Sequence, residues 1–566
     1  MKLFNYDITS PFTLRTPAWL FPLLLIIPNV LLAFTEPEPA LSKLTDIVLP
    51  LGVYYLLMSL TTNVGRTVIC SLPLMILAAF QIVLLYLYGE SIIAIDMFLN
   101  VATTNVKEVS ELLGNLIIAI ITVILIYLPP IIWAIILLVR KFRCARKDLR
   151  ALRYTGGVLC TAGLILLMLS YILLPCYSVR RAVFPVNVTA NMIEAIDRTI
   201  HTGRYHSLSA SYSYDPVMTH SRDMREIYVV VVGETSRADN WQLYGYDRAT
   251  NPRLSEREDL IVFRRPLSES NTTHKSVPML LSPLNAKTFG DSIYFTKGIC
   301  SAFNEAGFNT AFFSNQRRNH SFIDFYAYQA QTTDFIRDKR PDALDLDLAA
   351  DLQEFISRSP SDKLFIVLHC YGSHFNYRER YDSSARMFTP DKASEASVEN
   401  RSELVNAYDN TIIATDALID NVISYLAGLD IPSALFYTSD HGEDIFDDER
   451  GRFLHASPTT TFTQLHVPFV VWISESYRLA FPEIVNNIEA NSDLNISTSR
   501  SLFPTVMSVA GLSSPIVDAS DDLSSAHYSE KPRLYLNDYN EAVPLATAGL
   551  RKYDFENAKK WNISTN

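Results

Sequence analysis

The stretch Ile227-Tyr228-Val229-Val230-Val231-Val232-Gly233-Glu234-Thr235-Ser236-Arg237 decides the fold of this 566-residue chain. A β-branched run of this length that stops at a glycine is typical of a buried central strand in a parallel sheet. Ligands of open α/β sheets bind beyond the carboxyl ends of the strands, where this sequence places a carboxylate and two hydroxyls. A second strand of this kind, 434–438, runs into Ser439-Asp440-His441-Gly442-Glu443. Because both strands end in metal-ligand residue types, the sequence predicts one shared metal site.

The first third of the chain has the composition of a membrane protein. Five long apolar stretches, each near the ~20 residues that cross a bilayer, cover 16–34, 45–60, 68–88, 116–139 and 157–174. One such stretch alone is compatible with a buried soluble helix, but the succession predicts a multi-pass α-helical membrane domain over residues 1–176. The first stretch is taken as a spanning helix rather than a signal peptide, since no small-residue cleavage site follows it.

The orientation of this domain follows from the charges of its short loops. The loop after the fourth stretch carries seven Lys and Arg residues between Arg140 and Arg153 against one acid, Asp148, and is therefore expected in the cytoplasm. Five crossings from an inside N-terminus place everything after Cys176 on the outer side of the membrane.

Charge divides along the same boundary. Residues 1–176 hold 12 Lys and Arg against 9 Asp and Glu, so with a net charge of −11 for the whole chain the remainder carries −14. An acidic outer domain argues against nucleic acid as a partner and fits a domain that handles cations at an anionic membrane surface.

Only two of the six cysteines, Cys300 and Cys370, lie in the outer domain. A disulfide between them cannot be deduced from sequence, so the domain is expected to depend on a large core rather than on cross-links.

From Glu226 onward, strand-like apolar runs alternate with helical patterns. Strands are predicted at 310–313, 364–369, 434–438 and 467–473, and helices at 292–306, 345–357, 402–426 and 501–510. This alternation predicts an α/β domain over 226–566, with a mostly parallel sheet covered by helices on both faces. The polar residues 177–225 are expected to form a connector along the membrane surface, with an amphipathic segment at 188–200.

Three further segments bring polar groups toward the sheet edge that carries Glu234 and Asp440-His441. The segment Asn271-Thr272-Thr273-His274-Lys275-Ser276-Val277-Pro278 opens a helix, 369–374 follows a central strand, and His455 lies in Phe453-Leu454-His455-Ala456. Carboxylates and imidazoles together match a zinc site with oxygen and nitrogen ligands. An isolated histidine is more often a hydrogen-bonded structural residue, whereas an Asp-His pair directly after a strand is more specific.

Five motifs, in this order, resemble those of the phosphoethanolamine transferases. They are Val232-Gly233-Glu234-Thr235-Ser236-Arg237-Ala238-Asp239, Thr273-His274-Lys275-Ser276-Val277-Pro278, Gly372-Ser373-His374, Asn406-Ala407-Tyr408-Asp409-Asn410 and Ser439-Asp440-His441-Gly442-Glu443. Members of this family are five-helix inner-membrane proteins of Gram-negative bacteria with a periplasmic domain like that of alkaline phosphatase and the sulfatases. The resemblance covers nearly the whole chain and implies a multi-pass protein of the bacterial inner membrane whose catalytic domain lies in the periplasm.

The resemblance also implies the residues of the site. Thr273 corresponds to the family's nucleophile, and Glu234, Thr273, Asp440 and His441 are expected to hold one zinc ion. The resemblance places His374 and His455 near the phosphoryl group or a second zinc ion. Among the neighbouring hydroxyls, the rivals of Thr273 are Thr235, Ser236 and Thr272.

Two further sets of residues are predicted to bind substrate. Asn100, Thr104 and Glu108 recur every four residues, so on a helix they form one polar stripe that is either a solvated face or a headgroup site. The resemblance matches this stripe to the family's headgroup-binding residues. Asn315 and Gln316, just past the strand at 310–313, are candidate substrate contacts.

The expected reaction transfers phosphoethanolamine from phosphatidylethanolamine to lipid A or lipopolysaccharide core through a phospho-threonine. A phosphoglycerol transferase, or a phosphodiesterase or sulfatase-like hydrolase of the same fold, is one alternative, since all share the metal chemistry. A membrane-anchored scaffold with a vestigial metal site is another. Where lipid A-modifying members commonly bracket the nucleophile with a cysteine pair, this chain has Glu269 and Met279, which leaves the acceptor open.

Overall fold

The computed structural model describes residues 2–3, 6–7, 11–36, 38–89, 92–103, 116–174, 177–393 and 395–565. The chain divides into two compact units, one of residues 1–99 and 112–197 and the other of residues 100–111 and 198–566. The main division therefore falls within the segment expected to connect the two domains.

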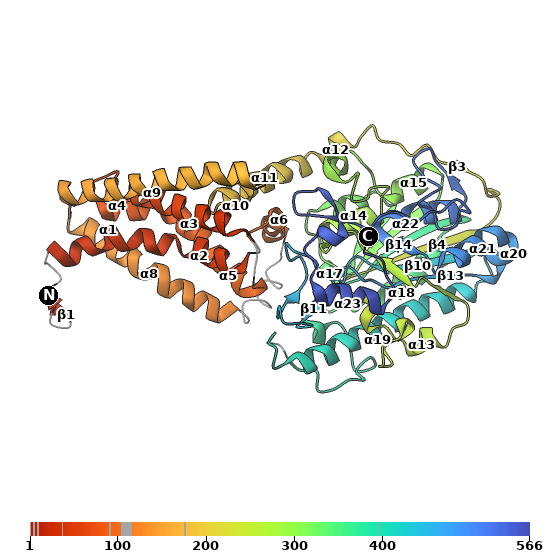
Figure 1. The fold of residues 1–566 in the computed structure, drawn as a ribbon. Helices are drawn as coiled ribbons and strands as arrows, with labels where there is room; N and C mark the ends of the chain where they lie inside the picture. Colours follow the sequence, from red (N-terminus) through yellow and green to blue (C-terminus); the bar gives the residue numbers. More distant parts are fainter. Residues whose placement is uncertain are drawn as a thin grey trace. The chain divides into compact units, whose positions relative to one another are not determined.

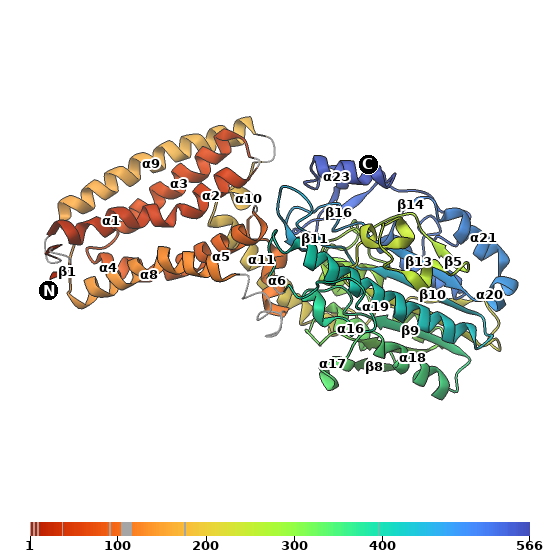
Figure 2. The same ribbon diagram turned by 90° about the horizontal axis from the view of Figure 1, so that it is seen from below.

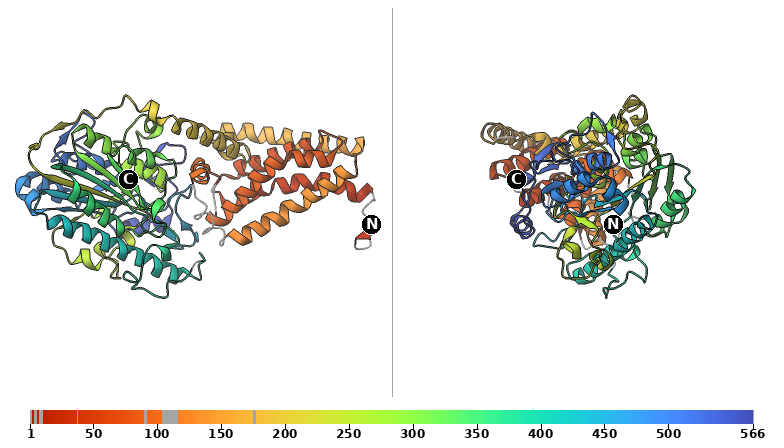
Figure 3. Two further views of the ribbon diagram at one scale, coloured as in Figure 1. Left: turned by 180° about the vertical axis from the view of Figure 1, so that it is seen from behind. Right: turned by 90° about the vertical axis from the view of Figure 1, so that its right-hand side faces the viewer.

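The first unit consists of helices that lie alongside one another (Figure 3). Their bounds are α1 (Pro11–Leu25), α2 (Ile27–Thr35), α3 (Ala40–Met58), α4 (Val64–Cys70), α5 (Leu72–Tyr88), α6 (Ile95–Thr103), α8 (Ile117–Val139), α9 (Arg146–Leu173), α10 (Val179–Ala182) and α11 (Val186–Thr202). Four helical segments are long and apolar enough to cross a membrane, or five if α4 and α5, bent by 54°, count as one span. The predicted apolar helices are thus confirmed, and the five crossings stay a prediction.

Helices α3 and α9 approach each other closely because glycines lie between them. A Cβ atom on Gly52 of α3 would come within 2.6 Å of the backbone nitrogen of Cys160. A Cβ atom on Gly163 of α9 would come equally close to the Cα atom of Leu49. Small residues at such crossings allow the extensive van der Waals contact that holds helices together in lipid.

The second unit is built on a seven-stranded sheet in the order β5-β13-β10-β4-β9-β7-β8. Of these strands, β4, β10 and β13 are labelled in Figure 1. The strands span β4 (Glu226–Gly233), β5 (Leu260–Val262), β7 (Asn309–Ser314), β8 (Thr332–Phe335), β9 (Lys363–His369), β10 (Ser433–Ser439) and β13 (Phe469–Ile473). All neighbours from β10 to β8 pair in parallel, and β13 alone runs in the opposite direction. The mostly parallel sheet is confirmed, with β4 at its centre as the opening stretch predicts.

Helices cover both faces of this sheet because β4 is buried on both sides. Val229 and Val231 face a core that includes α18 (Asp347–Arg358) and α19 (Arg401–Ala427) (Figure 2). Tyr228, Val230 and Val232 face the opposite core. That core includes α14 (Thr273–Leu280), α15 (Ile299–Glu305) and α22 (Thr498–Val509). Side chains alternate across a strand, so one continuous apolar run supplies both layers.

The parallel strands β4, β9 and β10 end at the same edge of the sheet. Their last pairings join Val232 to His369 and Gly233 to Ser439. The residues that follow, Glu234 and Asp440, therefore leave the sheet side by side.

Candidate active site and metal centre

Thr273 is the first residue of α14 and carries the hydroxyl at the centre of the site. Its Oγ1 donates a hydrogen bond to Glu234 Oε1 at 3.0 Å and lies 3.1 Å from His441 Nε2. Two other nearby hydroxyls are engaged elsewhere. Ser236 Oγ accepts from Trp241 Nε1, and Thr272 Oγ1 lies 3.1 Å from Ser270 Oγ.

Asp440 is held by the backbone around it. Its Oδ1 accepts hydrogen bonds from the backbone N–H groups of Thr235 at 3.1 Å and of His441 at 2.7 Å. Its Oδ2 lies 3.2 Å from His441 Nε2 and accepts a 3.4 Å hydrogen bond from Ser276. A residue with φ near +57°, Thr235, turns the chain so that its N–H points at Asp440.

The ring of His441 has a defined orientation. Its Nδ1 lies 2.9 Å from the carbonyl oxygen of Gly442, to which it donates, so Nε2 presents a lone pair toward Thr273 and the two carboxylates. Burial lowers the pKa of His441 to about 3, which keeps the ring neutral. This is the state in which an imidazole binds a metal ion.

The donor atoms of this cluster fit a divalent cation. Burial first, and repulsion from Asp440 second, raise the pKa of Glu234 well above its usual value, and burial also raises the pKa of Asp440. Two carboxylates and an imidazole lone pair crowd around a single hydroxyl, so acceptors face one another with too few protons between them. A cation among them removes that cost, and oxygen and nitrogen donors are those that zinc takes.

His455 extends the cluster on one side. Single atoms of Glu234, His441 and His455 lie within 4.8 Å of one another, the arrangement needed to share an ion. The ring of His455 lies 4.3 Å from that of His441 and 5.8 Å from that of His374. Behind it, Glu443 Oε1 lies 3.5 Å from His455 Nδ1, and burial raises the pKa of Glu443 to about 8.

The loop that carries His374 passes directly over Glu234. Gly372 adopts φ near +53°, and a Cβ atom there would lie 2.5 Å from the backbone oxygen of Glu234, so only glycine fits. His374 Nδ1 lies 2.7 Å from the carbonyl oxygen of Phe375 and its ring stacks on Tyr371. With Nδ1 donating to that carbonyl, Nε2 is the ring atom left to act in the site.

The sulfatase family profile matches residues 226–512, slightly more than half of the chain. The chain belongs to the sulfatase family. Within that family it is 30% identical over 318 residues to phosphoethanolamine transferase EptA of Escherichia coli K12, covering 55% of this chain and 57% of that protein. It is 28% identical over 304 residues to Kdo(2)-lipid A phosphoethanolamine 7''-transferase of the same strain, covering 52% and 53%. The chain thus spans about half the length of the curated relatives it matches.

Two solved structures show the same fold as this sulfatase-family chain. The integral membrane lipooligosaccharide phosphoethanolamine transferase A from Neisseria meningitidis superimposes with a TM-score of 0.70 at 22% identity, covering 91% of this chain and 98% of that one. The C-terminal periplasmic domain of EptC from Escherichia coli, in complex with zinc, gives 0.52 at 23% identity and covers 58% and 95%. Apolar helices followed by a sulfatase-like domain are therefore the shared architecture.

Gln316 and Asn315, both expected to contact substrate, donate hydrogen bonds to residues in and around the site. Gln316 Nε2 donates to Glu234 Oε2 and to the carbonyl of Cys370, each at 3.0 Å, and so orients the Glu234 carboxylate. Asn315 Nδ2 donates to Asp345 Oδ1 at 2.8 Å. Asp345 in turn accepts from the backbone N–H groups of Tyr371 and Gly372. Asp345 supports the loop over Glu234 and was missed from sequence because it lies in a helical pattern with no motif.

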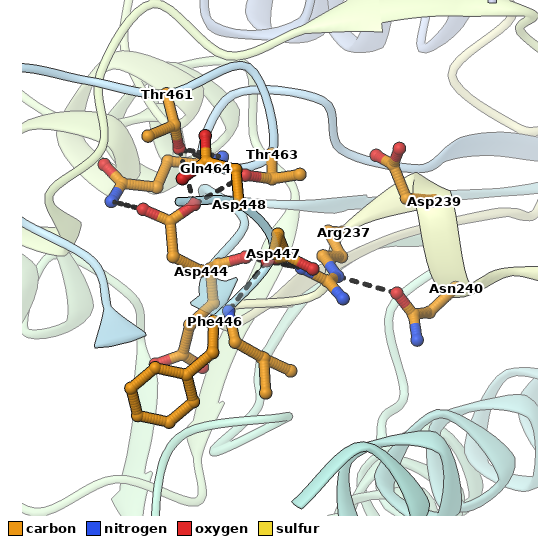
Figure 4. A network of polar contacts seen from close by, with 12 residues as sticks. Arg237, Asp239, Asn240, Asp444, Phe446, Asp447, Asp448, Thr461, Thr463 and Gln464 are labelled. Carbon is orange, nitrogen blue, oxygen red and sulfur yellow. Dashed lines mark hydrogen bonds and ion pairs between the residues drawn. The ribbon is translucent and has the colours of Figure 1, made fainter. Parts of the chain in front are cut away.

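A buried polar network beneath the Asp440 loop was also missed (Figure 4). The Arg237 guanidinium donates from Nη1 to the carbonyl of Glu443 at 3.1 Å and to Asp447 Oδ2 at 2.7 Å. Its Nε donates to Asn240 Oδ1 at 2.6 Å. Arg237 is part of the opening stretch, so its position was a signal, but its partners Glu443 and Asp447 lie 206 and 210 residues away in sequence.

Two expectations concern residues beyond this site. Thr104 and Glu108 of the predicted stripe lie outside the described residues, and Asn100 lies in α6. Cys300 and Cys370 are both buried free thiols, so no disulfide joins them.

Proposed function

We propose that this chain transfers phosphoethanolamine from phosphatidylethanolamine to lipid A or lipopolysaccharide core, through a covalent phospho-threonine at Thr273. The observation that carries the proposal is the position of Thr273 Oγ1, 3.0 Å from Glu234 Oε1 and 3.1 Å from His441 Nε2 at the start of α14. A nucleophile needs an acceptor for its proton within hydrogen-bond reach, and Glu234 is that acceptor here.

We assign one zinc ion to Glu234, Thr273, Asp440 and His441, with His374 and His455 beside the phosphoryl group or a second ion. Bound there, zinc supplies positive charge that lowers the pKa of the threonine hydroxyl and neutralises the phosphoryl oxygens. The N-terminus of α14 adds backbone N–H groups that favour the same negative charge.

The reaction divides into two displacements. In the first, Thr273 Oγ1 attacks phosphorus, its proton passes to Glu234, and the bond to the diacylglycerol oxygen breaks. The leaving oxygen takes a proton from His374 or His455. In the second, a hydroxyl or phosphate oxygen of the acceptor attacks the phospho-threonine and gives its proton to the same histidine. The bond from phosphorus to Thr273 Oγ1 breaks, and this oxygen takes back the proton held by Glu234.

The names of the relatives support the transferred group and the acceptor. Two are phosphoethanolamine transferases, and one of these acts on Kdo(2)-lipid A. We extend both to this chain, with the catalytic domain in the periplasm and the helices of the first unit in the inner membrane. The stripe Asn100, Thr104 and Glu108 is the proposed contact for the donor headgroup.

Substitution of Thr273 tests the proposal. Thr273→Ala should abolish transfer and the covalent intermediate, because no other hydroxyl of the described residues contacts both Glu234 and His441, while zinc still binds through the three remaining ligands. Thr273→Ser should keep part of the activity, since it keeps a hydroxyl. The measurements are mass spectrometry of lipid A and core from cells with and without the gene, peptide mapping after incubation with donor lipid, and metal content.

Thr235→Ala is the matched control and should retain the intermediate. Phosphoethanolamine found on Thr235, Ser236 or Thr272 would refute the assignment of Thr273. Release of free phosphoethanolamine with no modified lipid would identify a hydrolase instead, and phosphoglycerol on the acceptor would identify the other transferase.

A further inference from the structure

A cavity lies at one end of the first unit, where α2 ends and α3 begins, and it takes no part in the site described above. Parts of α2, α3 and α10 line it. Its volume is ≈ 50 Å³. On the same measure, one water molecule needs ~10–15 Å³. That is room for a small polar group of a few non-hydrogen atoms.

Asp46 offers the cavity a carboxylate that lacks a basic partner. Its Oδ1 accepts from the Tyr177 hydroxyl at 2.9 Å and its Oδ2 from Ser42 Oγ at 3.3 Å. No Lys or Arg within the described ranges of the chain forms an ion pair with it. A carboxylate has about four lone-pair sites, so both oxygens can accept further hydrogen bonds.

Asn29 supplies a second acceptor. Its Nδ2 donates to the backbone oxygens of Asp46 at 2.7 Å and Phe184 at 2.8 Å, which fixes the orientation of the amide. The side chain is 2% exposed, and its Oδ1 is buried without a hydrogen-bond partner in the described part of the chain. A buried carbonyl oxygen left this way is costly unless a ligand donates to it.

Charged residues of both signs complete the lining, the acids Glu36 and Glu38 and the cations Lys43 and Arg181. Lys43 lies one helical turn before Asp46 on α3, yet its ammonium forms no ion pair with that carboxylate or with any other acid of the described residues. Arg181 of α10 also lines the cavity and is exposed. The cavity is therefore lined by three carboxylates and an amide oxygen that can accept from an ammonium, and by two cations that can attract a phosphate, an arrangement complementary to a zwitterion with both groups.

The position of the cavity points to the source of that zwitterion. The loop between α2 and α3 is at the end of the bundle that the loop charges assign to the outer side of the membrane. Phospholipid headgroups lie at this depth. Headgroups with a quaternary ammonium have no N–H to donate to Asp46 and Asn29, whereas a primary ammonium has three.

We propose that this cavity binds the headgroup of a phospholipid that carries a primary ammonium, with the ammonium at Asp46 and Asn29 Oδ1 and the phosphate at Lys43 and Arg181. This second headgroup site uses none of the residues of the stripe Asn100, Thr104 and Glu108. This proposal rests on the proposed function in one respect, which is that a lipid bound here then belongs to the class of the donor. Such a lipid is held ready for the transfer reaction.

Native mass spectrometry of the full chain in detergent micelles tests this proposal. Phosphatidylethanolamine, phosphatidylcholine and phosphatidylglycerol with identical acyl chains are the probes. The wild type should retain phosphatidylethanolamine about tenfold or more over phosphatidylcholine, the size expected for charge-assisted hydrogen bonds. Asp46→Asn should lose this preference. Lys43→Gln should weaken the retention of phosphatidylethanolamine and of phosphatidylglycerol.

Glu194→Gln is the matched control, because it removes one carboxylate from the same unit at an exposed ion pair with Arg180. It should bind like the wild type. Displacement of the lipid by soluble phosphoethanolamine would support recognition of the headgroup. Displacement by inorganic phosphate alone, or unchanged binding in both Asp46→Asn and Lys43→Gln, would overturn it.

The two proposals fail separately. Thr273→Ala should keep the preference for phosphatidylethanolamine although it cannot transfer the headgroup. If the wild type transfers phosphoethanolamine but its lipid preference does not depend on Asp46, this inference is wrong and the proposed function stands. If the preference depends on Asp46 but the wild type transfers nothing, the proposed function is wrong and this inference stands.

Discussion

Asp444 shows how a single buried acid couples the stability of this chain to pH. Its Oδ1 accepts from the hydroxyls of Thr461 at 2.7 Å and Thr463 at 2.6 Å, and its Oδ2 accepts from Gln464 at 2.7 Å (Figure 4). Burial nevertheless raises its pKa from the ordinary 3.8 to about 7. Between these values the folded chain holds a proton that the unfolded chain releases.

The free energy of unfolding should therefore fall as pH rises through that window, and the contribution of Asp444 should be fully present only below it. Asp444→Asn cannot titrate, so its unfolding free energy should depend less on pH than that of the wild type. Urea unfolding of both proteins between about pH 4 and about pH 8 gives the difference. Parallel curves for the two proteins would mean that Asp444 keeps an ordinary pKa.

At this scale the sequence predicted residue types better than side-chain directions. Glu234, Thr273 and His441 meet as expected, because strand ends and a helix start fix where each backbone leaves the sheet. Asn315 and Gln316 donate hydrogen bonds to Asp345 and Glu234, which the sequence did not predict, and their contact with substrate stays a prediction. The path of a loop after a strand sets such directions, and no local pattern encodes that path.

Among the elements, the segment from Asp440 to Asp447 depends on a buried ion pair for its conformation. Arg237 and Asp447 have side chains only 5% and 9% exposed. Arg237→Ala leaves Asp447 buried with fewer partners, so we expect a loss of about 3–5 kcal/mol of unfolding free energy. The measurement is denaturant unfolding of the full chain in micelles, followed by tryptophan fluorescence.

Arg358→Ala is the comparison, because Arg358 forms an ion pair with Glu354 on the surface of α18 at 78% and 56% exposure. Its cost should stay below about 0.5 kcal/mol. Similar losses for the two variants would show that the Arg237 pair does not fix this segment.

Sequence patterns identified the long elements and missed the short ones. Strands β4, β9 and β10 carry apolar runs buried on both faces, so their positions were predicted within one or two residues. Strands β5 and β8 lie at the edges of the sheet and have only three and four residues. Edge strands have fewer buried positions, and pairing with a distant neighbour rather than local sequence makes them strands.

For the molecule as a whole, the loop charges predict on which side of the membrane each part of the chain lies. The basic loop between α8 and α9 should lie in the cytoplasm and the sulfatase-like unit outside it. Alkaline phosphatase fused after Ala210 should be active, whereas the same reporter inserted after Arg143 should not. A reporter active only in the cytoplasm should show the reverse pattern, and agreement of both reporters on an inside location for Ala210 would reject this topology.

The thiols of Cys300 and Cys370 lie deep in the two cores on either side of the sheet. Burial raises the pKa of Cys300 to about 12, and since the thiolate is the reactive form, this sulfur is chemically quiet. Folding of the sulfatase-like unit then needs no disulfide between these two thiols. The sulfatase-like unit should therefore fold and keep its site equally well in oxidising and in reducing surroundings.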